Sequence, residues 1–253
     1  MGTRDANLFV DPKDRSDLPE VFDDFETDYA TLSKEWHRSK RNGEKLCQFT
    51  ASTAINVIAP PRAGKRLLVL DLDHTLLDFK QDSVAQRPFL EYFLTACYVN
   101  YDLVIWSQTS WRWLEVKMTE LGLLAHAHFK VCFVLDKTSM FSIVSRKSDG
   151  AEFKHQVKPL QLIWAKHPHW SANNTVHVDD LSRNFALNPS SGVKCRPFRR
   201  GDASAAADVE LQLLAVYLTH ICATPDFEQL DHTKWRTVVK ALSGSAAPSS
   251  RRS

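Results

Sequence analysis

Residues 66–79 read RLLVLDLDHTLLDF, an apolar run that ends in two carboxylates with one residue between them. A continuous apolar run is typical of a parallel strand covered on both faces, and in such sheets ligands bind beyond the carboxyl ends of the strands. Asp71 and Asp73 would stand at that end, on one side of the strand, before the chain turns at His74 and Thr75. Two carboxylates this close repel each other unless a cation or a shared proton relieves the repulsion. Because Mg2+ prefers oxygen ligands, the stretch predicts a magnesium site.

Two later apolar runs also end in polar side chains. Residues 103–107 read LVIWS, and residues 175–180 read TVHVDD. Strands of one parallel sheet that end in acids converge at one edge, so we expect Asp179 and Asp180 to face the same metal as the first acidic pair. The alternatives are a surface acidic pair and, for Ser107, an ordinary helix cap.

The composition bounds the class of protein. The 253 residues are enough for one sizeable α/β domain with an appended segment. The five cysteines are scattered, odd in number and form no CxxC pair, which favours a reduced intracellular compartment. A net charge of +2 gives no argument for nucleic acid, and no apolar stretch approaches membrane-spanning length. We therefore expect no direct nucleic-acid partner and no membrane partner.

The pattern DxDxT at Asp71, Asp73 and Thr75 resembles the first motif of the haloacid dehalogenase (HAD) superfamily. The longer string DLDHTLLD is similar to that of the Fcp/Scp group of protein serine phosphatases. Later blocks resemble the ubiquitin-like-domain-containing CTD phosphatases more closely still: YDLVIWS at 101–107, VKPL at 157–160, VDDLSRNF at 178–185 and RPF at 196–198. The resemblance covers roughly residues 60–240, and the shared order of the blocks makes it specific.

This resemblance implies an α/β fold with a HAD-like Rossmannoid parallel sheet between helices. The short span between Thr75 and a helix predicted to begin at Pro88 leaves no room for a cap domain, and an open cleft suits a phosphorylated protein segment. The insert at 136–156 resembles the small β-hairpin that Fcp/Scp enzymes place beside the active site. We expect the phosphatase domain to span 46–242, between a partly helical, acidic-then-basic segment at 1–45 and a disordered tail at 243–253.

The resemblance also implies catalytic roles. Asp71 would attack phosphorus, and Asp73 would protonate the leaving oxygen and then activate water. Mg2+ would bind the Asp71 carboxylate and the Asp73 backbone carbonyl. Its third protein ligand would be Asp180, with Asp179 as the second choice or as a supporting ligand. Thr75 would brace the turn after the nucleophile.

Four basic or hydroxyl side chains are expected to contact the phosphorylated substrate. Ser107 stands at the second-motif position and Lys158 at the third, where they would stabilise charge on the phosphoryl group. Lys158 directly precedes a predicted helix start, and the alternative to its catalytic role is an ordinary surface lysine. Arg183 lies in a block shared with the CTD phosphatases. Arg146 lies in the hairpin insert, for which an ordinary solvated tip is an equally good interpretation.

Together these features predict a Mg2+-dependent protein serine/threonine phosphatase, monomeric and nuclear or else cytoplasmic, that works through an aspartyl-phosphate. The resemblance implies phosphorylated repeats of the RNA polymerase II tail as substrate. The similar phosphatases carry an N-terminal ubiquitin-like domain that docks the proteasome. This chain begins near the linker that follows that domain, so we expect a fragment or a protein that lost it, and the proteasome is a weaker expectation. The alternatives are a phosphatase of small-molecule or nucleic-acid phosphates and a non-catalytic phosphoprotein-binding scaffold.

Overall fold

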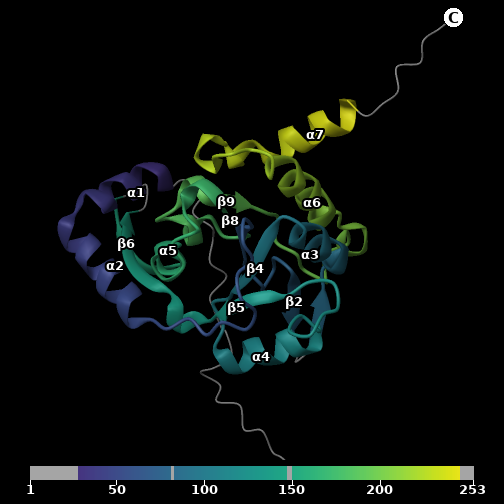
Figure 1. The fold of residues 1–253 in the computed structure, drawn as a ribbon, viewed down its shortest axis with the longest axis horizontal. Helices are drawn as coiled ribbons and strands as arrows, with labels where there is room; N and C mark the ends of the chain where they lie inside the picture. Colours follow the sequence, from purple (N-terminus) through teal and green to yellow (C-terminus); the bar gives the residue numbers. More distant parts are fainter. Residues whose placement is uncertain (1–27, 81–82, 147–149, 246–253) are drawn as a thin grey trace, which may run out of the picture.

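A central parallel sheet organises the computed structural model, which describes residues 28–80, 83–146 and 150–245. The strand order is β5-β4-β1-β8-β9, and every neighbouring pair is parallel (Figure 1). The predicted α/β class is confirmed. Most of the acidic run of the N-terminal segment and most of the predicted tail lie outside the described residues. The strands of the sheet are β1 (Arg66–Leu70), β4 (Tyr101–Trp106), β5 (Val131–Leu135), β8 (Thr175–Asp179) and β9 (Gly192–Lys194).

Helices cover both faces of this sheet, which explains why β1 is apolar at successive positions. Leu68 and Leu70 face a core that includes side chains of α3 (Leu90–Tyr98), α4 (Trp111–Glu120), α6 (Glu210–Ile221) and α7 (Trp235–Ser245). Leu67 and Val69 face a second core, to which α5 (Gln161–Lys166) and α2 (Lys40–Ser52) contribute. Alternation along β1 therefore directs the next odd-numbered residue, Asp71, towards the α5 side of the sheet.

Two small antiparallel hairpins accompany the sheet. The predicted hairpin insert is confirmed as β6 (Phe141–Arg146) and β7 (Glu152–Val157), and it ends one residue before Lys158. A second hairpin, β2 (Leu77–Lys80) and β3 (Ser83–Gln86), fills the span between the first acidic motif and α3. The sequence did not indicate this second hairpin. It is only a pair of four-residue strands, so the absence of a cap domain in this span stands as expected.

The N-terminal segment contributes two helices that pack on the domain. Helix α1 (Tyr29–Arg38) is capped by Asp28 and tied to the main domain by Ser33, whose Oγ donates to the Leu187 carbonyl at 3.1 Å. Helix α2 continues through residue 45 without a break and contributes Leu46 and Phe49 to buried clusters. None of the described helices is both long enough and apolar enough to cross a bilayer. The remaining elements are short 3-10 turns at Lys137–Ser139, Ala172–Asn174, Ser182–Phe185, Pro189–Ser191, Ala205–Ala207, Phe227–Gln229 and His232–Lys234.

Candidate active site

Three carboxylates meet at the carboxyl ends of β1 and β8. The two strands are hydrogen-bonded in parallel with Leu70 opposite Val178, so Asp71 and Asp179 follow at the same level. Carboxylate oxygens of Asp71, Asp179 and Asp180 all lie within 4.8 Å of one another. All three residues are buried, with exposed fractions of 4%, 0% and 8%. The structure thus brings together acids that are more than a hundred residues apart in the chain.

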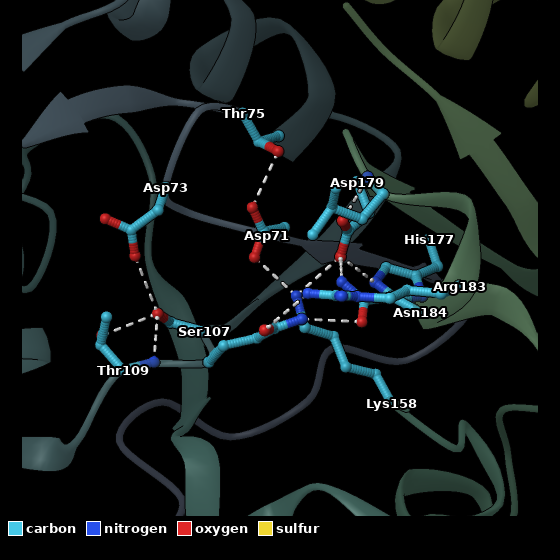
Figure 2. A network of polar contacts seen from close by, with 12 residues as sticks. Asp71, Asp73, Thr75, Ser107, Thr109, Lys158, His177, Asp179, Arg183 and Asn184 are labelled. Atoms are coloured by element: carbon cyan, nitrogen blue, oxygen red, sulfur yellow. Dashed lines mark hydrogen bonds and ion pairs between the residues drawn. The ribbon is translucent and has the colours of Figure 1, made fainter. Parts of the chain in front are cut away.

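Lys158 is the cation of this cluster. Its Nζ donates to Asp71 Oδ1 at 2.5 Å and to Asp179 Oδ2 at 2.7 Å, and its side chain is fully buried (Figure 2). The hairpin β6–β7 ends just before it, and its backbone N–H donates to the Asn184 carbonyl. The interpretation of Lys158 as a surface lysine is therefore wrong, because tertiary packing places it between the two acidic strand ends.

The balance of charge in the cluster shifts the pKa values of its carboxyl groups. Burial and the neighbouring Asp179 carboxylate raise the pKa of Asp71 to about 7, although Lys158 opposes the shift. Burial, Asp179 and Asp71 together raise the pKa of Asp180 to about 9. Burial by itself would also raise the pKa of Asp179, but Lys158 and His177 lower it below the ordinary range. One ammonium is thus too little positive charge for three buried carboxylates.

The donor set of this cluster fits a divalent cation of the Mg2+ type. Three carboxylates facing one ammonium leave two negative charges, the charge that one divalent cation balances. Asp179 is already engaged, because it accepts from Lys158, from Asn184 Nδ2 at 2.8 Å and from the Leu181 N–H at 2.9 Å. Asp180 accepts no hydrogen bond from another residue in the described part of the chain. This difference favours Asp180 as the direct ligand and Asp179 as the supporting one.

Asp73 lies apart from the three-carboxylate cluster. The chain turns after it at His74, which adopts a left-handed conformation with φ of 61° and donates its N–H to the Leu77 carbonyl at 2.7 Å. One carboxylate oxygen of Asp73, Oδ2, accepts from Ser107 Oγ at 3.1 Å, and the other, Oδ1, accepts from Lys117 Nζ. Figure 2 shows Asp73 directed towards Ser107 and Asp71 directed towards Lys158. The two acids of the first motif therefore have different partners and different surroundings.

Ser107 sits where β4 ends, next to β1. Its side chain is fully buried, and its Oγ contacts Thr109 Oγ1 at 2.8 Å and accepts from the Thr109 N–H at 3.1 Å. The parallel register of β1 and β4 pairs Leu70 with Ile105, so the ends of the two strands lie side by side. A hydroxyl donor thus stands beside the acids of the first motif, as the sequence led us to expect from its place after a strand.

Thr75 holds the carboxylate of Asp71 directly. Its Oγ1 donates to Asp71 Oδ2 at 2.8 Å, so both oxygens of Asp71 are fixed, one by Thr75 and one by Lys158. The Thr75 carbonyl in turn accepts from the fully buried Arg87 at 3.0 Å, and Arg87 forms a two-pronged ion pair with Asp208. The Arg87–Asp208 support was not predicted, because its two members are 121 positions apart and neither lies in a recognised motif.

The structure describes the two expected substrate-binding arginines to different extents. Arg183 approaches Gln108 Oε1 at 3.5 Å, and burial lowers its pKa. Gln108 Nε2 donates to Asn184 Oδ1 at 2.8 Å, which connects this arginine through Asn184 to Asp179. Arg146 is the last residue of β6, and its side chain lies outside the described part of the chain. Asn184 was quoted in a motif block but given no role from sequence.

The raised carboxyl pKa values predict a pH-dependent stability in the absence of metal. A carboxyl group whose pKa is higher in the folded chain binds its proton more tightly there, so the free energy of unfolding falls as the pH rises from the unfolded-state pKa to the folded-state pKa. The loss due to Asp71 should be complete near pH 7, whereas the loss due to Asp180 should continue to about pH 9. Between these values Asp180 alone should contribute a slope of up to about 1.4 kcal/mol per pH unit. Mg2+ should therefore raise the melting temperature more at the alkaline end of this range.

Thermal unfolding across this range, with Mg2+ and with a chelator, measures the effect. Asp180→Asn removes one of the two titrating groups and should flatten the metal-free profile, whereas Asp202→Asn, at an exposed position, should leave it unchanged. A metal-free melting temperature that stays constant or rises between these pH values would contradict the charge balance described above.

Comparison with known proteins assigns the chain to a family. Residues 66–228 match the model of the NLI interacting factor-like phosphatases, which is about two thirds of the chain. The chain belongs to this family. It is accordingly a protein phosphatase, and the resemblance noted in the sequence is confirmed.

Relatives named ubiquitin-like domain-containing CTD phosphatase extend the match over nearly the whole chain. The Drosophila melanogaster relative is 41% identical over 246 residues, which cover 93% of this chain and 73% of the relative. The Xenopus laevis relative is 36% identical over 249 residues, covering 96% and 76%, and the Arabidopsis thaliana relative is 39% identical over 246 residues, covering 94% and 69%. These matches include both N-terminal helices.

A solved structure is similar at a lower level. It is a variant of the fission yeast RNA polymerase II CTD phosphatase Fcp1 bound to beryllium fluoride, with a TM-score of 0.45 and 14% identity over 82% of this chain and 70% of that chain. The family assignment stands on the sequence matches, and this likeness adds nothing to it.

Proposed function

We propose that this phosphatase hydrolyses phosphoserine and phosphothreonine in protein segments, with Mg2+ as cofactor and Asp71 as the residue that becomes phosphorylated. The observation that carries the proposal is the different environment of the two motif acids. Asp71 is buried and fixed by Thr75 and Lys158, whereas Asp73 is partly exposed and held by Ser107 and Lys117. Two carboxyl groups in unlike surroundings can divide the roles of nucleophile and of acid and base between them.

The first step forms a bond between an Asp71 oxygen and phosphorus while the bond from phosphorus to the serine or threonine oxygen breaks. The proton for that leaving oxygen comes from Asp73. In the second step water attacks the phosphorus of the aspartyl-phosphate, Asp73 takes the proton of the water, and Asp71 is restored as inorganic phosphate leaves. Division of one difficult displacement into two explains why the site needs both acids.

Charge on the transferring phosphoryl group is stabilised by donors that the fold has already placed. Lys158 is held by two carboxylates, and Ser107 is held by Thr109, so neither needs to reorganise during the reaction. Asp71, Asp180 and the backbone carbonyl of Asp73 would hold the cation, with Asp179 in support. When bound, the cation supplies further neutralisation of phosphate charge and orients the phosphoryl group.

The proposed substrate class is supported by the small size of the insertion after the first motif and by the names of the relatives. Among the described residues between the first motif and α3, the chain forms the β2–β3 hairpin and no larger insertion that would cover a small metabolite. Arg183, whose guanidinium approaches Gln108 Oε1 at 3.5 Å, would contact a phosphorylated peptide. The relatives are named CTD phosphatases, which makes phosphorylated repeats of the RNA polymerase II tail our proposed substrate and the nucleus our proposed location. The protein would act as a monomer, and proteasome subunits are a weaker proposal.

Release of phosphate from a phosphoserine CTD-repeat peptide, measured beside p-nitrophenyl phosphate, tests the proposal. We expect turnover of the peptide that requires Mg2+ and stops when a chelator is added. Turnover of the small ester alone would keep the chemistry and reject the protein substrate. A folded wild-type protein that binds Mg2+ but turns over neither ester would favour the scaffold alternative.

A further inference from the structure

We propose that Lys117 is a positioning residue for Asp73, which it holds in place for proton transfer to the leaving oxygen. This inference rests on the proposed function, because it concerns the acid of the same reaction. Lys117 lies in α4, outside every motif that identified the family from the sequence. Its Nζ contacts Asp73 Oδ1 while Ser107 donates to Asp73 Oδ2. The two oxygens of the carboxylate are therefore held by residues of α4 and of the segment after β4.

The surroundings of Lys117 set it apart from an ordinary helix-surface lysine. Its side chain is only 3% exposed, on a helix whose other basic residue, Arg112, is exposed. Its Nζ lies 4.9 Å from the ring centroid of Phe79, and Phe79 packs in turn against Trp113 at 5.6 Å between ring centroids. Asp73 is the only acidic side chain in ion-pair contact with Lys117 within the described residues.

This arrangement is costly for the fold on its own. Removing an ammonium from water is unfavourable unless partners compensate, and the single Phe79 ring offsets only part of that cost. An apolar residue of similar volume often serves stability at least as well. The Asp73 side chain is 27% exposed, so water solvates its charge and the fold does not require a buried cation beside it. A lysine at this position is therefore better explained by what it does to Asp73 than by what it does for packing.

The consequence for Asp73 is geometric. The Asp73 carboxylate points towards Ser107, and its contacts with Ser107 and Lys117 hold it there, off the metal cluster (Figure 2). In the first step the proton on Asp73 passes to the substrate oxygen as that oxygen leaves phosphorus. A serine alkoxide is a poor leaving group and depends on this proton, whereas p-nitrophenolate leaves readily without it. Misplacement of Asp73 should therefore harm the two kinds of ester unequally.

The test compares kcat/KM of Lys117→Met and wild type across esters of different leaving groups. We expect a loss of about a hundredfold for the phosphoserine peptide and for phenyl phosphate, but less than about fivefold for p-nitrophenyl phosphate. Lys117→Arg keeps the charge and should recover part of the peptide activity. Arg112→Met, the same loss of charge on the exposed side of the helix, should leave all three esters at wild-type rates.

Equal losses for all esters in Lys117→Met would overturn the inference, since a purely structural role lowers every rate together. An unchanged peptide rate would overturn it as well. Should Lys117→Met not fold, Lys117→Gln supplies the same comparison of leaving groups. Failure of the proposed substrate would look different, because wild type would then turn over the aryl esters but not the peptide. In that case the ratio of kcat/KM for phenyl phosphate to that for p-nitrophenyl phosphate, compared between wild type and Lys117→Met, would still decide the role of Lys117.

Discussion

Replacement of Asp71 by asparagine should lower phosphate release from the peptide by on the order of ten-thousand-fold or more, because the amide cannot form the phosphorylated intermediate. The same change should not destabilise the metal-free protein. Asparagine has the shape of aspartate and removes one charge from a cluster in which three carboxylates share one ammonium. Activity would thus disappear while the melting temperature at alkaline pH stays the same or rises, a separation of function from stability that is expected at an active site.

Asp78→Asn is the matched control for this prediction. Asp78 is also fully buried, and its Oδ2 accepts from the Arg200 N–H at 3.0 Å, a bond that the oxygen of an asparagine keeps. Its activity should stay within about fivefold of wild type. Direct detection of phosphoprotein after rapid acid quenching should succeed with wild type and fail with Asp71→Asn. Residual turnover above a few per cent in a freshly prepared Asp71→Asn protein would assign the nucleophile to another residue.

Lys158→Met should have the second-largest effect, because this lysine would neutralise charge on the phosphoryl group and also neutralises buried carboxylates of the fold. Its removal leaves Asp71 and Asp179 buried without their cation, and loss of one partner of a buried ion pair costs about 3–5 kcal/mol. We expect the melting temperature to fall in the absence of metal and to recover in part with Mg2+. Loss of a preorganised donor to the phosphoryl group should lower kcat by at least about a hundredfold.

Lys154→Met provides the comparison for Lys158→Met. Lys154 lies on β7, the strand that ends just before Lys158, and its side chain is exposed. Its loss should change the melting temperature by no more than about a degree or two and leave kcat unchanged. Near-wild-type kcat in a folded Lys158→Met protein would show that metal and Ser107 suffice for charge stabilisation.

Local patterns in the sequence were enough to predict the architecture of the sheet end. The apolar runs before Asp71 and Ser107 are long and unbroken because both faces of their strands are buried, so they indicated parallel strands directly. Acids after two such runs predicted the meeting of Asp71 with Asp179 and Asp180, which the structure shows. The hairpin insert, by contrast, was predicted from the resemblance of residues 136–156 to the insertion of Fcp/Scp enzymes.

The residues that position the catalytic side chains could not be predicted from the sequence. The helical periodicity of α4 does not predict whether Lys117 is exposed or buried. Only its packing against Phe79 brings it to Asp73. The Arg87–Asp208 pair and the burial of Lys158 depend on contacts between segments that are distant in the chain. No local preference encodes such contacts.

By itself, then, the sequence determined which strands end in reactive side chains, because a buried parallel strand is a continuous apolar run that can be recognised in a short stretch of sequence. Only the tertiary structure decided how those side chains divide the work. The surrounding charges and hydrogen bonds come from α4, from Lys158 just after β7 and from the turn after β8. They set the partners of each carboxylate and so separate Asp71 from Asp73 and Asp180 from Asp179.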